Sequence, residues 1–501
     1  MKDITNMSNN KTSTSGIAFY VAVGKILAMI AQFIMPLFLT RFLTKHDYGL
    51  YSQFYLIFGF LLSVLGMGMQ SNLYFFYPKS SSNEQKHQVW GTYILLMFMG
   101  IIGCLFFLIP PINHFIVNNA YLEEYVYLIA ACVFLGMPSL MIDPLSVVRK
   151  DKLLAIIYHP VEIVSKIILV IAFALIFKSL DAIFYGILIL EFLIFVFVTC
   201  YLTVNYHYPS DRSSCDLLKR QIAYSLPFGV AVILNTFAGR FDKLLSVSFL
   251  TPEEYATYSI AFFGIPGIMQ VYDSLCQVNV TNMARLYKDN DILGVKAEYQ
   301  RFVVKTLSFS LPVILIAFIY TPQIIKLLFT EKYIDSVPFF RIYILTFILG
   351  MVGSGTILRA IDRTKLSMKA YLISVCLTLP LSYFLIKTYG IWGAIVSVVI
   401  STIVPKLFQI GFEMRCIQSS FKDYFPWRRI LFLFSISLAG LLPVILLNAF
   451  VDVKVVLAIV ISIVYVISVY GVYIYHGDFI VDPSVLKSHA VAFADKLRMK
   501  R

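Results

Sequence analysis

Charged residues are scarce in this chain. Asp, Glu, Lys and Arg make up 14% of its 501 residues, whereas an ordinary soluble domain averages about 25%. Hydrophobic residues make up 59%, which excludes a soluble protein. Long apolar runs such as Trp90 to Ile112 and Ile183 to Val204 indicate membrane spans, because a bilayer crossing takes about 20 mostly apolar residues.

Several signatures of chemistry are also missing. The seven cysteines include no Cys-x-x-Cys pair, the seven histidines show no metal-ligand spacing, and no nucleotide-binding loop occurs. We therefore expect no disulfide framework, metal, cofactor or ATP-driven step. The Asp289-Asn290-Asp291 run resembles a glycosyltransferase motif, but we interpret it as a solvated turn. The predicted outer loops are too short for a glycosyltransferase or polymerase domain, so we expect no enzyme.

The hydrophobic runs predict about 14 transmembrane helices. Their ranges are 16–40, 48–71, 89–112, 122–147, 153–177, 182–204, 222–241, 255–280, 303–325, 337–358, 366–386, 390–412, 430–450 and 455–475. The first range is too long for a signal-peptide core and is followed by Arg41 without a small-residue cleavage site, so we expect a retained span.

Lys and Arg are distributed unevenly between alternate loops. The chain has 41 Lys and Arg residues. Of these, 27 lie in the termini and the loops on one side, 9 in the loops on the other side and 5 within predicted spans. Because Lys and Arg favour the cytoplasmic side of a membrane, both termini are predicted to be cytoplasmic. The net charge of +13 then reflects membrane topology, and we expect no nucleic-acid partner.

One short motif occurs twice. It reads FLTKHDYGLYS at Phe42 to Ser52 and FLTPEEYATYS at Phe249 to Ser259, with six of eleven positions identical at an offset of 207. The copies follow the first and seventh predicted spans, so both are expected on the outer face. A chance match in a Tyr- and Phe-rich chain is the alternative. We favour two homologous six-helix halves related by an axis along the membrane normal, an arrangement typical of transporters.

These patterns predict an all-α polytopic membrane protein with two pseudo-symmetric halves and a terminal helix pair. The predicted segments are a cytoplasmic N-terminal segment (1–15), an N-terminal six-helix half (16–204), a cytoplasmic linker (205–221), a C-terminal six-helix half (222–414), a cytoplasmic loop (415–429), the terminal helix pair (430–476) and a basic cytoplasmic tail (477–501).

The topology and the repeated motif resemble the MOP superfamily, and most closely its polysaccharide branch, the flippases of O-antigen and capsule repeat units. The residues that carry the resemblance are Leu43, Thr44, Tyr48, Gly49, Tyr51, Ser52, Gly66-Met67-Gly68 and Leu226-Pro227. The resemblance implies two halves that form a V around a hydrophilic central cavity. It also implies transfer of a polyprenyl-diphosphate-linked oligosaccharide from the cytoplasmic to the outer leaflet.

Three cations are candidate substrate-binding residues. Lys25 lies about ten residues into the first predicted span, and Arg41 and Arg240 lie near the outer ends of the first and seventh. A diphosphate needs cationic, multi-donor partners, and the resemblance implies cavity-lining cations on the first helices of each half. The alternative is that Lys25 forms a structural ion pair while Arg41 and Arg240 extend to the membrane interface.

Carboxylates at membrane depth are candidates for cation coupling, because ionisable residues there are costly and mark ion pathways. Glu162 lies one helical turn from Lys166, so the two form either a structural pair or a cavity-facing pair. Glu191 and Asp273 are further candidates, while Asp143 is interpreted as a helix-end residue. Lys406 is expected either to face the cavity or to pair with Glu413.

The function predicted from the sequence is an inner-membrane flippase that moves undecaprenyl-diphosphate oligosaccharide by alternating access, coupled to a cation gradient. The lipid bilayer and other glycan-assembly membrane proteins are its expected partners. A cation-coupled efflux transporter for drugs and organic cations is the alternative, but such an exporter needs acids in the cavity where this chain offers cations. A lipid II flippase would carry more arginines in its early helices, and a structural scaffold would not need buried charges in both halves.

Overall fold

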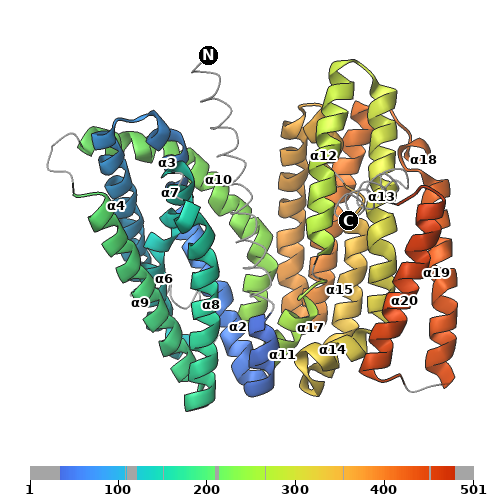
Figure 1. Ribbon diagram of the computed structural model, residues 1–501, viewed down its shortest axis with the longest axis horizontal. Helices are drawn as coiled ribbons and strands as arrows, with labels where there is room; N and C mark the ends of the chain where they lie inside the picture. Colours follow the sequence, from blue (N-terminus) through green and yellow to red (C-terminus); the bar gives the residue numbers. More distant parts are fainter. Residues whose placement is uncertain are drawn as a thin grey trace, which may run out of the picture. The chain divides into compact units, whose positions relative to one another are not determined.

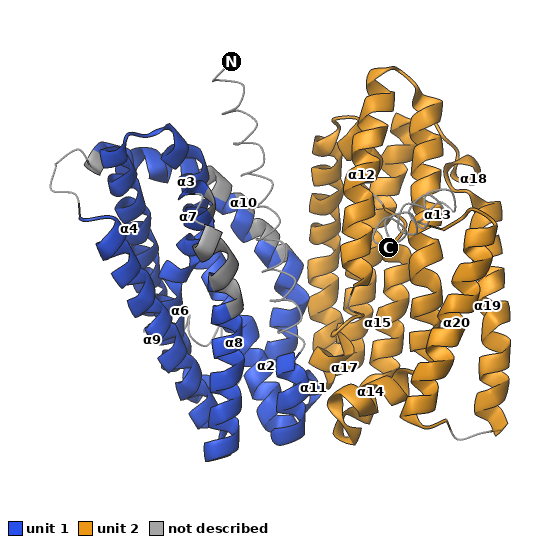
Figure 2. Ribbon diagram, viewed as in Figure 1, with its two compact units in different colours: residues 1–256 blue, residues 257–501 orange. Residues whose placement is uncertain are grey.

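The computed structural model describes residues 34–107, 109, 121–149, 152–208, 214–265, 267–353, 355–450 and 453–479. These residues form α-helices joined by short 3-10 helices and turns, and none of them lies in a strand (Figure 1). The predicted all-α fold is confirmed. The chain separates into two compact units, residues 1–256 and 257–501 (Figure 2).

The first unit begins, in its described part, with a helical segment at 34–42. Its further helices are α2 (Lys45–Gly66), α3 (Asn72–Phe76), α4 (Ser82–Phe107), α6 (Val126–Gly136), α7 (Ile142–Arg149), α8 (Lys152–Phe177), α9 (Leu180–Asn205), α10 (Ser214–Phe249) and the start of α11 (Pro252–Ala261). Helix α10, the predicted seventh span, packs against α2 and α4. The boundary between the compact units therefore follows residue 256, whereas the predicted second half begins at residue 222.

The second unit holds the remaining helices. They are α12 (Ile268–Lys288), α13 (Ile292–Ile319), α14 (Thr321–Phe329), α15 (Val337–Gly350), α16 (Thr356–Ala360), α17 (Thr364–Cys416), α18 (Phe421–Tyr424), α19 (Trp427–Phe450) and α20 (Val455–Tyr475). Helices α19 and α20, the predicted terminal pair, pack on α13.

Within the described residues, nine helices are long and apolar enough to cross a membrane. One of them, α17, covers two predicted spans. Its 53 residues are interrupted at Gly390, where φ is 53° and ψ is −129°, a conformation that favours glycine. Beyond it the chain folds back, since Ser397 lies 2.5 Å from Ser382 (Oγ to Oγ) and Gln409 donates to Ser367 at 3.0 Å. The predicted segments 366–386 and 390–412 are thus the two arms of one hairpin.

Two other predicted spans are broken. The range 122–147 is interrupted by a 3-10 segment, Met137–Met141, which separates α6 from α7. The range 255–280 is divided between α11 and α12, with Gly264 and Gly267 in the intervening bend. Proline accounts for the first break, because Pro138 lacks the N–H that would continue the helix. The resulting short helices position polar side chains inside the first unit.

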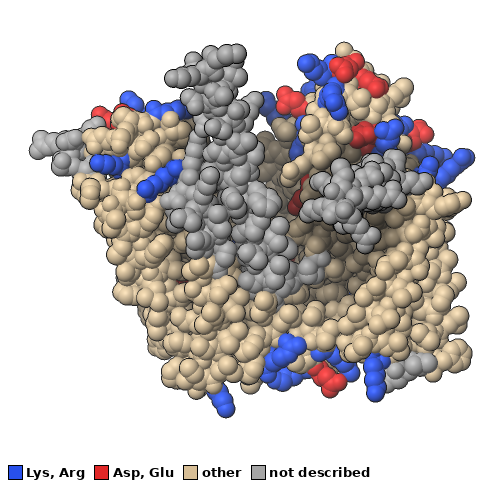
Figure 3. Space-filling view, in the orientation of Figure 1, with Lys and Arg blue, Asp and Glu red and all other residues tan. Residues whose placement is uncertain are grey.

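The surface of each unit suits a bilayer. The flanks of the helices are almost free of charge, and Lys, Arg, Asp and Glu gather near the helix ends (Figure 3). Helices α19 and α20 expose large apolar side chains such as Phe450 (85%) and Val456 (75%). Lipid, rather than water, is the solvent that tolerates such flanks.

The two copies of the repeated motif form the same local structure. Thr44 precedes α2 and accepts a hydrogen bond from the backbone N–H of Asp47 at 3.1 Å. Thr251 precedes α11 and accepts from the N–H of Glu254 at 3.3 Å, while the Glu254 carboxylate accepts from the N–H of Thr251 at 3.0 Å. Each copy therefore starts a helix by satisfying backbone donors that the helix leaves unpaired.

The two copies also touch each other. A Cβ atom at Gly49 would lie 1.8 Å from the carbonyl oxygen of Pro252, so only glycine fits where α2 passes the start of α11. His46 Nδ1 lies 2.6 Å from Glu253 Oε1, and these residues occupy matching positions in the repeat. The two helix starts thus meet at matching positions of the repeat.

The crossing predicts that Gly49→Ala destabilises the protein, by about 1–3 kcal/mol, because the backbone carbonyl of Pro252 cannot move aside as a side chain could. The matched control is Gly239→Ala in α10, where a Cβ meets nothing within 4 Å. The control should be neutral or slightly stabilising, since alanine favours helix by about 1 kcal/mol over glycine. Thermal unfolding of the full-length protein in detergent measures the stability of both variants. Equal unfolding midpoints for Gly49→Ala and Gly239→Ala would contradict the close approach of Gly49 to Pro252.

A double-mutant cycle tests the pairing of His46 with Glu253. Burial acts to raise the pKa of Glu253, but hydrogen bonds from its backbone, His46 and Thr251 outweigh it and lower that pKa. The stabilisation is therefore present above the unfolded-state pKa and lost as pH falls through the folded one. We expect a coupling of about 0.5 kcal/mol between His46→Gln and Glu253→Gln at neutral pH, because both side chains are partly exposed. It should vanish below about pH 4, and a coupling of zero at neutral pH would refute the pairing.

Candidate functional site

An ion pair joins two helices of the first unit. Lys166 Nζ of α8 lies 3.7 Å from Glu191 Oε1 of α9, with side chains 20% and 5% exposed. The ammonium also lies 5.0 Å from the centre of the Tyr55 ring. Gly136 of α6 makes room for the carboxylate, since a Cβ there would lie 3.2 Å from Glu191 Oε2. Each charge of such a buried pair depends on the other, because a lone ion in a medium of low polarity is strongly unfavourable.

Helical spacing indicates a further neighbour for Lys166, on its own helix. Glu162 and Lys166 lie one turn apart on α8, and the sequence predicts that they share a helix face. The two side chains line one cavity, and an ion pair also joins Lys166 to Glu191 on the next helix. Two of the carboxylates predicted for cation coupling, Glu162 and Glu191, therefore lie around the same ammonium group.

A cavity of about 540 Å³, the tyrosine cavity, opens beside this pair. Its walls come from the segment before α2, from α2 and from α8. The lining residues are Met35, Pro36, Tyr48, Tyr51, Ser52, Tyr55, Glu162, Ile163, Lys166 and Ile167. Tyr48, Tyr51 and Ser52 belong to the first copy of the repeated motif. The motif thus both starts a helix and supplies hydroxyl groups to a cavity that holds a carboxylate and an ammonium.

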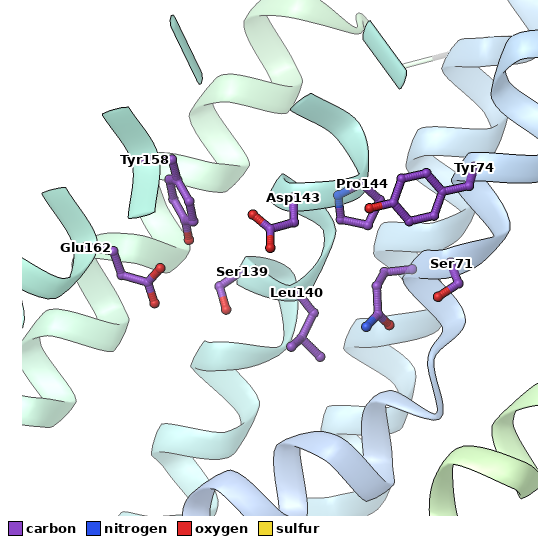
Figure 4. A pocket seen from close by; sticks show the side chains of 9 residues that line it. Ser71, Tyr74, Ser139, Leu140, Asp143, Pro144, Tyr158 and Glu162 are labelled. Atoms are coloured by element: carbon purple, nitrogen blue, oxygen red, sulfur yellow. The ribbon is translucent and has the colours of Figure 1, made fainter. Parts of the chain in front are cut away.

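A second cavity of about 340 Å³, the acidic cavity, lies between the 3-10 break and α8 (Figure 4). Glu162 and Tyr158 of α8 face Asp143 and Ser139 across it, and Ser71 and Tyr74 lie on its other side. Its lining residues are Gln70, Ser71, Tyr74, Ser139, Leu140, Asp143, Pro144, Tyr158 and Glu162.

Asp143 has more than the helix-end role that the sequence indicated. It does lie in the first turn of α7, yet its carboxylate also points into the acidic cavity (Figure 4). Sequence reasoning missed this because the break at Met137–Met141 turns α7 inward, and no residue pattern specifies that direction. Pro138 and Pro144 signal a break in the sequence, but not its direction.

Glu162 lines both cavities. Its neighbours are a second carboxylate, Asp143, on one side and an ammonium, Lys166, on the other. Such a group can take up a proton or a small cation, because carboxylate, hydroxyl and amide oxygens are ligands for hard cations. Among the described residues, no group of three His, Cys, Asp or Glu side chains could hold a metal ion.

The predicted cations are placed only in part. Lys25 lies outside the described residues. Arg41 is exposed near the end of the first helical segment, where its guanidinium donates to the carbonyl oxygen of Leu37. Arg240 of α10 is half-buried against α2, since a Cβ at Gly59 would lie 3.3 Å from its Nη1. In the part of the chain that the structure describes, Arg240 has no ion-pair partner.

The second unit holds the remaining candidates. Asp273 is exposed on α12 and belongs to a different unit from Glu162 and Glu191. Of the two alternatives for Lys406, the pairing with Glu413 is wrong. Glu413 is fully buried and accepts from the N–H of Ile357 at 2.8 Å and from the hydroxyl of Tyr424 at 2.6 Å.

Lys406 instead donates to a backbone carbonyl, that of Leu349, at 3.3 Å. Glu413 is the acceptor that the first turn of α16 needs, because a helix leaves its first N–H groups without partners. The carboxylate thereby holds α16 and α18 to α17. This role is structural, and it was missed because the partners lie 56 and 11 residues away.

Comparisons with known proteins agree with this fold. A family model described as polysaccharide biosynthesis protein matches residues 38–338, more than half of the chain. An uncharacterized membrane protein of Methanocaldococcus jannaschii is 20% identical and covers 93% of this chain and 95% of its own.

Two solved structures are similar in fold. The lipid II flippase MurJ, in an inward closed conformation, has a TM-score of 0.69 at 15% identity and covers 91% of this chain and 99% of its own. An inward-facing multidrug resistance MATE family transporter of the MOP superfamily has a TM-score of 0.55 at 14% identity, covering 78% and 94%. The chain therefore belongs to the polysaccharide biosynthesis protein family, and it has the fold of the flippases and transporters of the MOP superfamily.

Proposed function

We propose that this protein moves a polyprenyl-diphosphate-linked oligosaccharide from the cytoplasmic to the outer leaflet by alternating access. The observation that carries the proposal is the family match over residues 38–338, taken together with a fold similar to that of a lipid II flippase. A polysaccharide precursor assembled on a lipid must cross the membrane before it is used outside. A polytopic helical protein is the kind of structure that can offer it a passage.

The substrate-binding groups that we propose are Lys25, Arg41 and Arg240, acting on the diphosphate. Arg240 supports the proposal best, because a half-buried guanidinium without an ion-pair partner in the described chain is costly unless an anion joins it. Arginine can bind two phosphate oxygens at once, and lysine contributes a point charge.

We further propose that transport is coupled to a cation gradient, through Glu162 and Glu191 in the first unit and Asp273 in the second. The two cavities that meet at Glu162 support this role. Protonation of Glu162, or cation binding to it, would change its attraction to Lys166 and so the balance of the Lys166–Glu191 pair. A change of charge at one carboxylate can thereby alter how α8 and α9 pack.

The wider arrangement belongs to the same proposal. The chain would consist of two homologous six-helix halves, 16–204 and 222–414, and a terminal pair, 430–476, around a V-shaped central cavity. It would lie in the bacterial inner membrane with both termini cytoplasmic, beside other glycan-assembly proteins. O-antigen or capsule repeat units carried on undecaprenyl diphosphate are the substrates that we expect.

Efflux of organic cations is the second candidate function. The acidic cavity, with Asp143 and Glu162 facing each other, favours it, as does the similarity in fold to a multidrug transporter. At about 340 Å³ the acidic cavity is at the lower end of the range for drug-sized ligands.

The flippase proposal predicts that cells lacking this protein accumulate the lipid-linked oligosaccharide on the cytoplasmic side, measured by mass spectrometry of extracted lipids. Wild-type protein should reverse the accumulation. Lys25→Ala and Arg240→Ala should each lower the rate of export by about tenfold or more, because a lost charge-assisted phosphate contact is worth about 1.5–3 kcal/mol.

The matched control for Arg240 is Lys219→Ala, which removes a cation from an exposed position on the same helix, 74% exposed. It should restore export like the wild type at equal protein levels. An unchanged lipid pool and an unchanged surface glycan in the deletion strain would reject the flippase function. Loss of resistance to an organic cation in that strain would support efflux instead.

Coupling is tested in proteoliposomes under an imposed pH or Na⁺ gradient. Glu162→Gln should reduce the stimulation of transport by the gradient about tenfold while leaving gradient-free exchange intact, because the amide keeps the shape but cannot change its charge. Glu331→Gln, at an 82% exposed position on η5 (Glu331–Ser336), is the control. Wild-type transport that ignores both gradients would remove the coupling role from all three carboxylates.

A further inference from the structure

A third cavity, in the second unit, lies apart from the sites discussed so far. It has a volume of about 430 Å³ and is formed by the beginning of α13, the beginning of α19 and the residues that follow α20. We call it the basic cavity. The distribution of Lys and Arg places these helix ends on the predicted cytoplasmic side.

Cations from two helices line the basic cavity. Arg301 and Lys305 lie one turn apart on α13, so their side chains share a face, and Arg429 comes from the first turn of α19. Asp478, after α20, is the one acid in the lining and forms an ion pair with Arg429. The ionised side chains of the wall thus carry a net charge of about +2 with His476 neutral.

Not all of these cations are neutralised within the described chain. Arg301 lies 3.4 Å from Glu298, at the outer limit of a hydrogen bond, and its side chain is 73% exposed. Lys305 is exposed, and its ammonium group forms no hydrogen bond or ion pair within the described chain. Asp478 is only 5% exposed and holds Arg429 in place. The arrangement is a rim of positive charge around a hollow of about 430 Å³, with Arg429 held in place by Asp478.

The apolar surroundings indicate what kind of anion reaches this rim. Trp427 and Tyr475 are exposed beside the cavity on α19 and α20, and Leu431 is 63% exposed one turn further along. Tryptophan and tyrosine mark the membrane interface, and exposed aliphatic side chains beyond them face acyl chains. A lipid whose headgroup occupied the cavity would lay its chains along the exposed flank of α19 and α20.

We propose that the basic cavity binds the phosphodiester headgroup of an anionic phospholipid of the cytoplasmic leaflet. The phosphate would accept charge-assisted hydrogen bonds from Arg301, Lys305 and Arg429, and basic pockets between transmembrane helices are known to take such headgroups. The bound lipid would tie the terminal pair α19–α20 to α13. A polyprenyl diphosphate shares the phosphate chemistry, so the test separates the two sources.

The experiment is native mass spectrometry of the full-length protein in detergent, titrated in turn with phosphatidylglycerol, phosphatidylcholine and a short-chain polyprenyl diphosphate. Wild-type protein should retain one phosphatidylglycerol at concentrations where phosphatidylcholine is lost. The double variant Arg301→Gln, Lys305→Gln should weaken this binding about tenfold or more. The matched control, Lys288→Gln with Lys296→Gln, removes two cations from the same end of the unit but outside the cavity, and should bind like wild type.

Equal retention of phosphatidylglycerol and phosphatidylcholine, or equal weakening in both double variants, would overturn the proposal. Displacement of phosphatidylglycerol by equimolar polyprenyl diphosphate, again dependent on Arg301 and Lys305, would assign the cavity to the lipid diphosphate instead. If the double variant does not fold, Lys305→Gln alone serves, because its ammonium makes no bond within the described chain. In the Lys305→Gln variant, phosphatidylglycerol should raise the midpoint of thermal unfolding less than it does in the wild type.

Discussion

The first unit depends on the close approach of two helix starts. Gly49 of α2 lies against the carbonyl of Pro252, so the two copies of the repeated motif cross where no side chain intervenes. Each copy closes its own helix start with a threonine, Thr44 or Thr251. Tyr48 and Tyr51, on either side of Gly49 in α2, line the tyrosine cavity. The two copies of the motif are therefore similar in sequence and also in contact with each other.

Charge inside a membrane protein imposes the second constraint. Lys166 and Glu191 compensate each other across α8 and α9, and Glu162 stands between that pair and the second carboxylate, Asp143. Because an uncompensated charge is costly in such surroundings, the state of one carboxylate bears on its neighbours. In the function that we propose, this shared dependence couples a cation to a change of packing in the first unit. In the second unit the buried carboxylate is Glu413. It accepts hydrogen bonds from the backbone N–H of Ile357 and from the hydroxyl of Tyr424, so its role is structural.

Broken helices decide where polar groups lie. The 3-10 segment Met137–Met141 turns Asp143 into the acidic cavity, and the bend at Gly390 folds α17 back on itself. Irregular backbone at membrane depth is tolerated where it is buried in protein or lines a cavity. The break before α7 meets that condition, because its residues Ser139 and Leu140 line the same cavity as Asp143. The terminal pair differs, with regular helices, an apolar flank and a basic cavity at one end.

The sequence by itself determined the helical class, the two apolar arms at 366–386 and 390–412, and the presence of charges at depth. It could do so because hydropathy, helical spacing and loop charge are local properties of the chain. It also found the repeated motif, but equivalence in sequence does not show that His46 and Glu253 meet. Only the tertiary structure decided that Lys166 pairs with Glu191 rather than solely with Glu162, and that Glu413 caps α16 instead of pairing with Lys406. The physical reason is that partners on different helices are selected by the angles at which the helices pack, and those angles depend on the whole set of side chains between them.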